Sequence, residues 1–333
     1  MLPAATPYFK ASAAWPPRYH SPHPPPRAIS VKTHLSPRDL LLTLAIVAVW
    51  GYTFVPIKVA LREVPPFALA SVRFALAALP LVFFIRRPAM PWRYIVSYGI
   101  AIGVLQFGLL FLGMKLGMPA GLSSLVIQLQ VFFTIGLAVM LDGDRLRPHN
   151  LVGAGIAVVG VALLAAHKLG AGESATLIGF LLVIAAGLSW AVGNIIAKRG
   201  AGEHAPDMFA LVVWSSLIPP LPLAALSYAF EGGDAAIHAV ITMSALAWAC
   251  LAVMAYGATL FGFGTWNALL HRYPTALISP FALLIPVSGI ASGVLFLGEK
   301  LAPLQMAGVA LVFGGLVVNT YAPRIRAWLA ERI

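Results

Sequence analysis

From Leu40 onward, apolar stretches of about 20 residues alternate with short polar breaks, and about 20 residues is the length that an α-helix needs to cross a bilayer. The pattern predicts an all-α membrane protein with ten transmembrane helices. The breaks are too short to fold a soluble domain, so we expect no separate catalytic module. The predicted spans are 40–61, 66–86, 94–115, 118–141, 150–167, 176–197, 207–229, 244–270, 275–297 and 303–321.

The composition agrees with this pattern. Of the 333 residues, 60% are hydrophobic and 10% are charged, whereas a soluble domain carries about 25% charged residues. A soluble enzyme and a disordered protein are therefore excluded. The single cysteine, Cys250, excludes an internal disulfide and a cysteine-based metal cluster.

Residues 1–37 differ from the rest of the chain. They hold nine of the 26 prolines, which prevents a continuous helix or a packed core. No apolar run follows that would make a signal peptide. We interpret residues 1–37 as a disordered cytoplasmic tail. The alternative is that translation starts at Val31 and residues 1–30 are not made.

Lysine and arginine gather on alternate polar segments. Sixteen of the 22 lie on the side of the N-terminus, four lie on the other side, and Lys58 and Arg73 lie within spans. Because segments rich in Lys and Arg stay in the cytoplasm, we expect both termini to be cytoplasmic. Topology therefore explains the net charge of +11, and no nucleic-acid partner is expected.

The chain contains an internal repeat. A shift of 155 residues brings Gly143–Leu146 onto Gly298–Leu301, and near the front of each half a shift of 140 brings Trp50 onto Trp190. Each half has five predicted spans, so the second half must enter the membrane from the opposite side. Inverted repeats are typical of alternating-access transporters.

Two motifs resemble those of a known family. Val49–Phe54 (VWGYTF) with Lys58 resembles the first-span motif of the EamA family of the drug/metabolite transporter superfamily. Gly298–Leu301 resembles the G-E-x-L motif of that family, and its first copy, Gly143–Leu146, departs from the motif at Asp144.

The resemblance covers about residues 38–320 and implies ten helices as two inverted five-helix EamA repeats. The repeats would occupy residues 38–167 and 168–321, with a cytoplasmic tail at 322–333. It also implies export of small amino acids and derivatives, of the cysteine and O-acetylserine type, across a bacterial inner membrane.

The acidic residues all lie in loops or at span ends, and no histidine lies in mid-span. Proton-coupled transporters place such groups within the membrane as relays, so we expect no tight proton coupling. The same absence leaves no residue set for a membrane hydrolase and no metal cluster. We therefore expect no enzyme activity and no cofactor.

Matching faces of the first and sixth spans carry candidate site residues at i, i+4 and i+8. The tryptophans form an aromatic wall for an ammonium group, or they pack helices. The lysines guide a carboxylate or act as gates, or they snorkel to the headgroups. The residues are Trp50, Phe54 and Lys58 on the first span, and Trp190, Asn194 and Lys198 on the sixth.

Three amides lie near mid-depth: Gln106 on the third span, and Gln128 and Gln130 on the fourth. We expect at least one to bind the substrate. The alternative is a helix–helix hydrogen bond worth about 1 kcal/mol. Residues two apart on a helix point to roughly opposite faces, so only one of Gln128 and Gln130 is expected to face a central cavity.

The remaining candidates lie on three other spans. Pro280 and Pro286 should interrupt the ninth helix, beside Ser279 as a binding residue, and free a carbonyl for a cation, or else only kink the helix. We expect Arg73 to be a strut bonded to backbone carbonyls. The eighth-span candidates are Tyr256, Trp266 and Asn267.

The partners expected are small zwitterionic amino acids or metabolites and the lipid bilayer. The glycine-rich fifth and tenth spans suit a scaffold or a homodimer contact. Export of aromatic, hydrophobic or diverse amino acids, or import of a nucleotide-type metabolite, stays open as an alternative. A nucleotide would want more intramembrane positive charge than Lys58 and Arg73 provide. A purely structural membrane protein would need no inverted symmetry.

Overall fold

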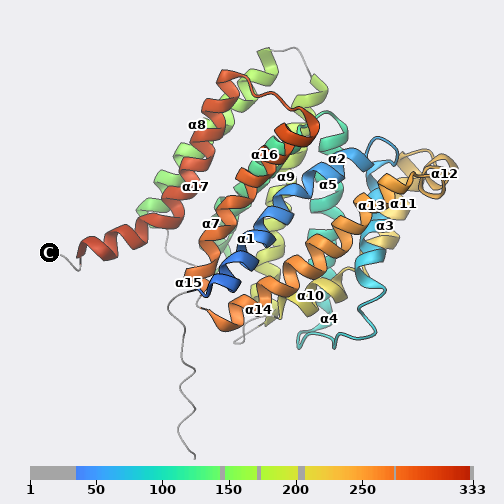
Figure 1. Ribbon diagram of the computed structural model, residues 1–333, viewed down its shortest axis with the longest axis horizontal. Coiled ribbons are helices and arrows are strands. Elements are labelled where there is room, and N and C mark those ends of the chain that lie inside the picture. Colours follow the sequence, from blue (N-terminus) through green and yellow to red (C-terminus); the bar gives the residue numbers. More distant parts are fainter. Residues whose placement is uncertain (1–34, 143–146, 171–173, 202–206, 274, 331–333) are drawn as a thin grey trace, which may run out of the picture. The chain divides into compact units, whose positions relative to one another are not determined.

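The computed structural model describes residues 35–142, 147–170, 174–201, 207–273 and 275–330, and the regular structure in these ranges is entirely helical (Figure 1). The greater part of the N-terminal tail and the first-half motif Gly143–Leu146 lie outside the described residues.

The first half contains the elements of five predicted spans. In chain order they are α1 (Pro37–Tyr52), α2 (Phe54–Ala60), α3 (Pro66–Ala78), α4 (Trp92–Tyr98), η1 (Gly99–Gln106), α5 (Phe107–Lys115), α6 (Ala120–Val126), η2 (Ile127–Leu129), α7 (Gln130–Asp142) and α8 (Pro148–Gly170).

The second half contains the elements of the other five predicted spans and also a short helix, α12, at a position where a loop was expected between two spans. Its elements are α9 (Ser174–Ala201), α10 (Met208–Ser215), α11 (Pro220–Phe230), α12 (Asp234–Ile241), α13 (Ala245–Ala252), η3 (Val253–Phe263), α14 (Gly264–Arg272), α15 (Thr275–Ile278), η4 (Ser279–Leu283), α16 (Leu284–Leu297) and α17 (Pro303–Ala330).

The two halves repeat the same order of irregular helical segments. The third span of each half contains a π-helical segment, η1 and η3, and the fourth contains a 3₁₀ segment, η2 and η4. The break at η4 falls at Ser279 and Pro280, where the sequence predicts an interruption. The matching break at η2 contains no proline and was not predicted.

Eight helical stretches of the described chain are long and apolar enough to cross a membrane, and the pair α10 and α11, bent by 42°, makes a ninth. The predicted second span, 66–86, is helical only over the 13 residues of α3 and continues as turns. The ten-helix prediction is therefore met only in part. At the C-terminal end, α17 continues to Ala330, past the predicted limit at residue 321.

Glycines allow α8 and α17 to lie side by side (Figure 1). A Cβ on Gly153 would lie 2.7 Å from the carbonyl oxygen of Gly315, and one on Gly160 would lie 2.7 Å from that of Gly308. The order of these pairs makes the helices antiparallel. Small residues that let two backbones approach are a common basis of helix association in lipid.

The glutamate of the Gly298–Leu301 motif joins the two halves. Gly298 ends α16 with a φ of +66°, in the left-handed region that favours glycine. Glu299 then accepts hydrogen bonds from the backbone N–H groups of Ala120 (2.5 Å) and Gly121 (2.9 Å). These groups open α6, where a carboxylate satisfies otherwise unpaired donors. We call this end of the helical bundle the Glu299 end.

Two further carboxylates at the Glu299 end also cross between the halves. Glu231, after α11, accepts from the N–H groups of Phe67 (2.8 Å) and Ala68 (3.1 Å) at the start of α3. Glu63, after α2, accepts from the backbone N–H and the hydroxyl of Ser244, each at 2.7 Å, at the start of α13. Each half thus supplies a cap to a helix of the other half.

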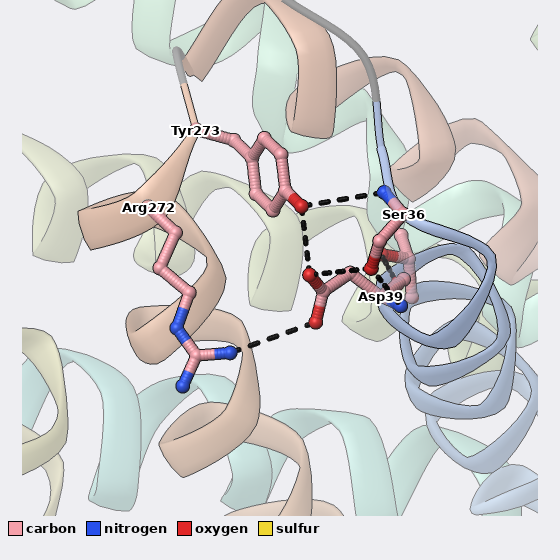
Figure 2. Close-up of polar contacts among 5 residues, drawn as sticks. Ser36, Asp39, Arg272 and Tyr273 are labelled. Carbon is pink, nitrogen blue, oxygen red and sulfur yellow. Dashed lines mark hydrogen bonds and ion pairs between the residues drawn. The ribbon is translucent and has the colours of Figure 1, made fainter. Parts of the chain in front are cut away.

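A polar cluster joins the halves at the opposite end, which we call the Asp39 end (Figure 2). The Tyr273 hydroxyl donates to Oδ2 of the buried Asp39 (2.7 Å), and Ser36 Oγ donates to the same oxygen (2.8 Å). Nη1 of Arg272 lies 3.6 Å from Oδ1 of Asp39. The start of α1 is therefore bonded to the end of α14.

The close approach of α8 and α17 predicts that Gly160→Ala lowers the free energy of unfolding by about 1–3 kcal/mol, because the added methyl group overpacks the contact. Unfolding in detergent measures this. Gly155→Ala is the matched control, since a Cβ there meets nothing within 4 Å, and it should be neutral or slightly stabilising. Equal effects of the two substitutions would contradict the proposed packing.

The cap from Glu63 predicts a pH dependence. The hydrogen bonds from Ser244 hold the pKa of Glu63 below its ordinary value of 4.5. Its contribution to stability is therefore complete above pH 4.5 and is lost as pH falls through the lower folded pKa. Glu63→Gln should lower the thermal midpoint at pH 7 and flatten its fall on acidification. Asp234→Asn, at an exposed acid that opens α12, is the control. An unchanged acid limb for Glu63→Gln would contradict this account.

Candidate substrate cavity

A cavity of about 330 Å³ is lined by residues of both halves. This volume lies at the lower end of the range of about 300–1,000 Å³ that is usual for small-molecule sites. In the first half its walls come from α1, α2, α3, η1, α5, η2 and α7, together with Tyr98 at the end of α4. In the second half they come from α9, α10, η3, α14, η4 and α16.

The cavity brings together many of the residues that the sequence singled out. Those that line it are Trp50, Phe54, Gln106, Gln128, Gln130, Trp190, Asn194 and Trp266.

Both Gln128 and Gln130 line the cavity, so the expectation that only one would face it is wrong. The reason is the 3₁₀ segment η2, Ile127–Leu129. The side chains of residues i and i+2 point about 160° apart in an α-helix, but only about 120° apart in a 3₁₀-helix. A uniform α-helical projection therefore misplaced one of the two amides.

A hydrogen-bond network crosses between the halves at the cavity wall. Nδ2 of Asn194 donates to Oε1 of Gln130 (2.8 Å) and to Oγ1 of Thr134 (3.1 Å). The Thr134 hydroxyl in turn donates to the backbone carbonyl of Gln130 (2.7 Å). These bonds fix the orientation of the Gln130 amide, because Oε1 must be the acceptor.

Another wall is aromatic. The ring centroid of Trp50 lies 5.2 Å from that of Phe263 and 5.3 Å from that of Trp266. The Trp50 indole N–H donates to the carbonyl of Ala258 (2.9 Å) in the π-helical segment η3.

The Ser189 hydroxyl similarly donates to the carbonyl of Ala101 in η1 (2.8 Å). Each π segment is thus bonded by the first span of the opposite half.

Arg73 differs from its sequence-based prediction. Its side chain is only 5% exposed and lines the cavity. Its Nε and Nη1 atoms have no hydrogen-bond partner, so they do not form the expected strut to backbone carbonyls. The guanidinium carbon lies 3.8 Å from the ring centroid of Phe107 and 5.0 Å from that of Phe74. No carboxylate among the described residues pairs with it.

Gln106 also presents an unpartnered atom. The side chain is 3% exposed, and Oε1 accepts no hydrogen bond. Among the buried side-chain N and O atoms that the structure describes, those without a partner are this oxygen and Arg73 Nε and Nη1. All three belong to residues that line the same cavity.

Two predicted binding residues lie elsewhere. Lys58 Nζ donates to the carbonyls of Met114 (2.6 Å) and Met118 (3.2 Å) and does not line the cavity. Tyr256 is 37% exposed and also lies off the cavity. It belongs to the π segment η3, in which side-chain directions differ from those of an α-helix.

Other predicted positions are not part of the lining. Lys198 is exposed near the end of α9, Pro280 lies in η4, and Pro286 lies in the first turn of α16. The side chains of Asn267 and Ser279 lie outside the described part of the structure.

Several lining residues were missed from the sequence. Tyr98 precedes η1 and Phe263 ends η3, so their directions depend on π-helical segments that apolar periodicity does not reveal. Thr53 lies at the junction of α1 and α2. Phe107 is one of many apolar residues on the third span, and nothing in the local sequence marks it as a partner of Arg73.

Most of the chain matches the sequence pattern of one known family. The EamA-like transporter family matches residues 38–166 and 177–321. The chain belongs to the EamA-like transporter family. It is therefore a multi-pass membrane protein of a transporter family, and both of its halves match the family separately.

Relatives at higher identity share nearly their whole length with it. The chain is 42% identical over 294 residues to a protein of Salmonella typhimurium named "Probable amino-acid metabolite efflux pump", covering 88% of this chain and 98% of that protein. It is 41% identical over 293 residues to the Escherichia coli protein of the same name, with the same coverage.

More distant comparisons agree in fold. The threonine/homoserine exporter RhtA of Escherichia coli is 28% identical over 273 residues, covering 79% of this chain and 84% of that protein. A crystal structure that is 23% identical matches with a TM-score of 0.57, over 86% of this chain and 98% of that chain. The crystal structure supports the fold alone.

The position of Lys58 predicts that Lys58→Ala lowers stability but leaves the KM of a transported substrate unchanged. The loss of its two hydrogen bonds should cost about 1.5–3 kcal/mol. Thermal unfolding and concentration-dependent uptake into proteoliposomes measure the two effects. Lys115→Ala is the matched control, because Lys115 Nζ donates to the carbonyl of Leu61 (2.6 Å). A raised KM for Lys58→Ala alone would return Lys58 to the binding site.

Proposed function

We propose that this protein exports small amino acids and their derivatives, of the cysteine and O-acetylserine type, across a bacterial inner membrane. The observation that supports this most is the cavity lined by amide, aromatic and guanidinium side chains from both halves. Such a lining suits a small zwitterion better than a lipid or an inorganic ion. The names of its relatives, an amino-acid metabolite efflux pump and a threonine/homoserine exporter, point the same way.

We propose alternating access as the mechanism. In this arrangement ten crossings, with α3 and the bent pair α10 and α11 as two of them, form two inverted five-span halves. The halves are tied by Glu63, Glu231 and Glu299 at one end and by Asp39 at the other. Release of one set of ties would open the cavity to one side while the other set holds.

The distribution of Lys and Arg supports an orientation of the helical bundle in the membrane. With both termini in the cytoplasm, the Asp39 end faces the cytoplasm and the Glu299 end faces the periplasm. A substrate would then enter past Asp39, Arg272 and Tyr273 and leave past the three glutamates. The chain would act as a carrier without a cofactor.

A second candidate is export of aromatic or hydrophobic amino acids. The rings of Trp50, Phe263 and Trp266 favour it, because they offer a wall on which a large apolar side chain could pack.

Counterflow into proteoliposomes preloaded with unlabelled substrate tests the proposal. We expect saturable uptake of labelled cysteine, kept reduced, and of O-acetylserine, with weaker uptake of threonine and phenylalanine. Faster uptake of phenylalanine than of cysteine and O-acetylserine would favour the second candidate. No saturable flux of any amino acid, with functional reconstitution confirmed by protein incorporation, would overturn the proposal.

The same vesicles address coupling. With no Asp or Glu among the described residues that line the cavity, counterflow should proceed at a similar rate with and without a pH gradient. Uptake that requires the gradient would contradict the absence of tight proton coupling.

A further inference from the structure

We propose that Arg73 and Gln106 form a recognition site for the α-amino-acid group of the substrate. The Arg73 guanidinium binds the carboxylate, and Gln106 Oε1 accepts a hydrogen bond from the ammonium group. This assignment rests on the proposed function, namely that the cavity holds an amino acid, and adds which of its residues recognise the part that all amino acids share.

The unpartnered atoms carry this inference. Buried polar atoms are nearly always hydrogen-bonded, and each exception calls for an explanation. Arg73 and Gln106 are 95% or more buried, with exposures of 5% and 3%. Their unpaired atoms are two donor nitrogens and one acceptor oxygen, on two residues that line one cavity. A zwitterion presents the complementary set, a carboxylate acceptor and an ammonium donor.

The surroundings of Arg73 keep its donors available. Nε and Nη1 carry three of the five N–H donors of a guanidinium. The guanidinium carbon lies over the ring of Phe107, at 3.8 Å from the centroid. The aromatic contact offsets part of the cost of burying the charge, but it supplies no hydrogen-bond acceptor in the plane of the group.

A carboxylate is the chemical partner that this arrangement lacks. A buried ion without a counterion is strongly unfavourable, whereas a hydrogen-bonded ion pair recovers much of that cost. Planar guanidinium groups bind carboxylates with charge-assisted hydrogen bonds. The empty protein therefore holds a charge that the substrate neutralises, and the protein binds such a substrate in preference to an uncharged one.

The position of Gln106 sets the orientation of the ligand. It ends the π segment η1 and directly precedes Phe107, the ring that stacks on Arg73. The acceptor for the ammonium group and the support of the carboxylate site thus come from consecutive residues. The side chain of the ligand would then extend along the other parts of the lining, where Trp50, Phe263 and Trp266 lie.

A water molecule is the competing partner for Arg73. A second, smaller cavity of about 30 Å³ is lined by Arg73 together with Tyr98, Ser215 and Thr259, which is more than the about 10–15 Å³ that one water needs at a polar site. If water is the only partner, removal of the guanidinium would leave substrate affinity unchanged.

The first experiment compares Arg73→Met with the wild type and with Arg87→Gln. Arg87 is the control because its guanidinium also stacks on an aromatic ring, that of Trp92, but it is exposed and lies away from the cavity. We expect Arg73→Met to unfold at the same or a higher temperature without ligand, since an unpaired buried charge has been removed. It should lose the rise in thermal midpoint that cysteine or O-acetylserine gives the wild type, and kcat/KM for either should fall by at least about 100-fold.

The conservative variants give a second readout. Arg73→Lys keeps the charge and should keep part of the affinity, whereas Gln106→Leu should raise the KM with a smaller effect than Arg73→Met. Unchanged KM and unchanged ligand-induced stabilisation in Arg73→Met would overturn the proposal and favour the water. If Arg73→Met fails to fold, Arg73→Lys and the analogues below still decide.

Analogues test the same site on the wild-type protein. Cysteamine lacks the carboxylate of cysteine, and 3-mercaptopropionate lacks its ammonium group. Both should compete with labelled cysteine at least about 100-fold more weakly than unlabelled cysteine, because each leaves a buried polar group unpaired. If cysteamine competes as strongly as cysteine, the role of Arg73 is overturned. If 3-mercaptopropionate competes as strongly as cysteine, the role of Gln106 is overturned. Absence of amino-acid counterflow in the wild type would instead contradict the proposed function.

Discussion

Within a bilayer each polar group must find its partner inside the protein, because lipid tails offer neither donors nor acceptors. The described residues meet this constraint in a consistent way. Glu299 and Glu231 satisfy the first N–H groups of α6 and α3, Lys58 satisfies one carbonyl in the last turn of α5 and one after it, and Asn194 bonds to Gln130. The buried atoms left over belong to Arg73 and Gln106, two residues that line the cavity. The constraint therefore separates the polar groups that build the fold from those left available for a ligand.

The same constraint shapes how the halves meet. The ties at the two ends of the bundle are carboxylates on loops or helix starts; Glu63 at one end is exposed, whereas Asp39 at the other is buried. At the level of the cavity the halves are joined by the half-buried amides of Asn194 and Gln130 and by bonds from Trp50 and Ser189 to the π segments. The glycine contact between α8 and α17 lies away from the cavity lining. Separate ties at the two ends, with further bonds between them at the level of the cavity, suit a molecule that opens at one end at a time.

Much of this architecture could be predicted from the sequence. Length and apolar periodicity indicated most of the helices, and the internal repeat indicated the two halves. The matching faces of the first and sixth spans pointed to the cavity residues Trp50, Trp190 and Asn194, and its mid-depth position pointed to Gln106. Arg73, Lys58 and Tyr256 could not be placed, for two different physical reasons: Tyr256 lies in a π segment, whereas Arg73 and Lys58 lie on the α-helices α3 and α2. A helical projection assumes 3.6 residues per turn, and the π segments η1 and η3 and the 3₁₀ segments η2 and η4 break it close to the cavity. Which lysine or arginine finds a carbonyl, and which stays unpaired, depends on contacts between distant helices.

The claim that the buried guanidinium of Arg73 binds the carboxylate of the substrate is tested most directly by a structure with bound ligand. L-Se-methylselenocysteine suits the purpose, since selenium marks the side chain in anomalous or high-resolution density. The account predicts the ligand in the cavity, with a carboxylate oxygen about 2.7–2.9 Å from a guanidinium nitrogen of Arg73 and the ammonium group beside Gln106. A ligand bound in the cavity with its carboxylate turned away from Arg73, or bound outside the cavity altogether, would contradict it.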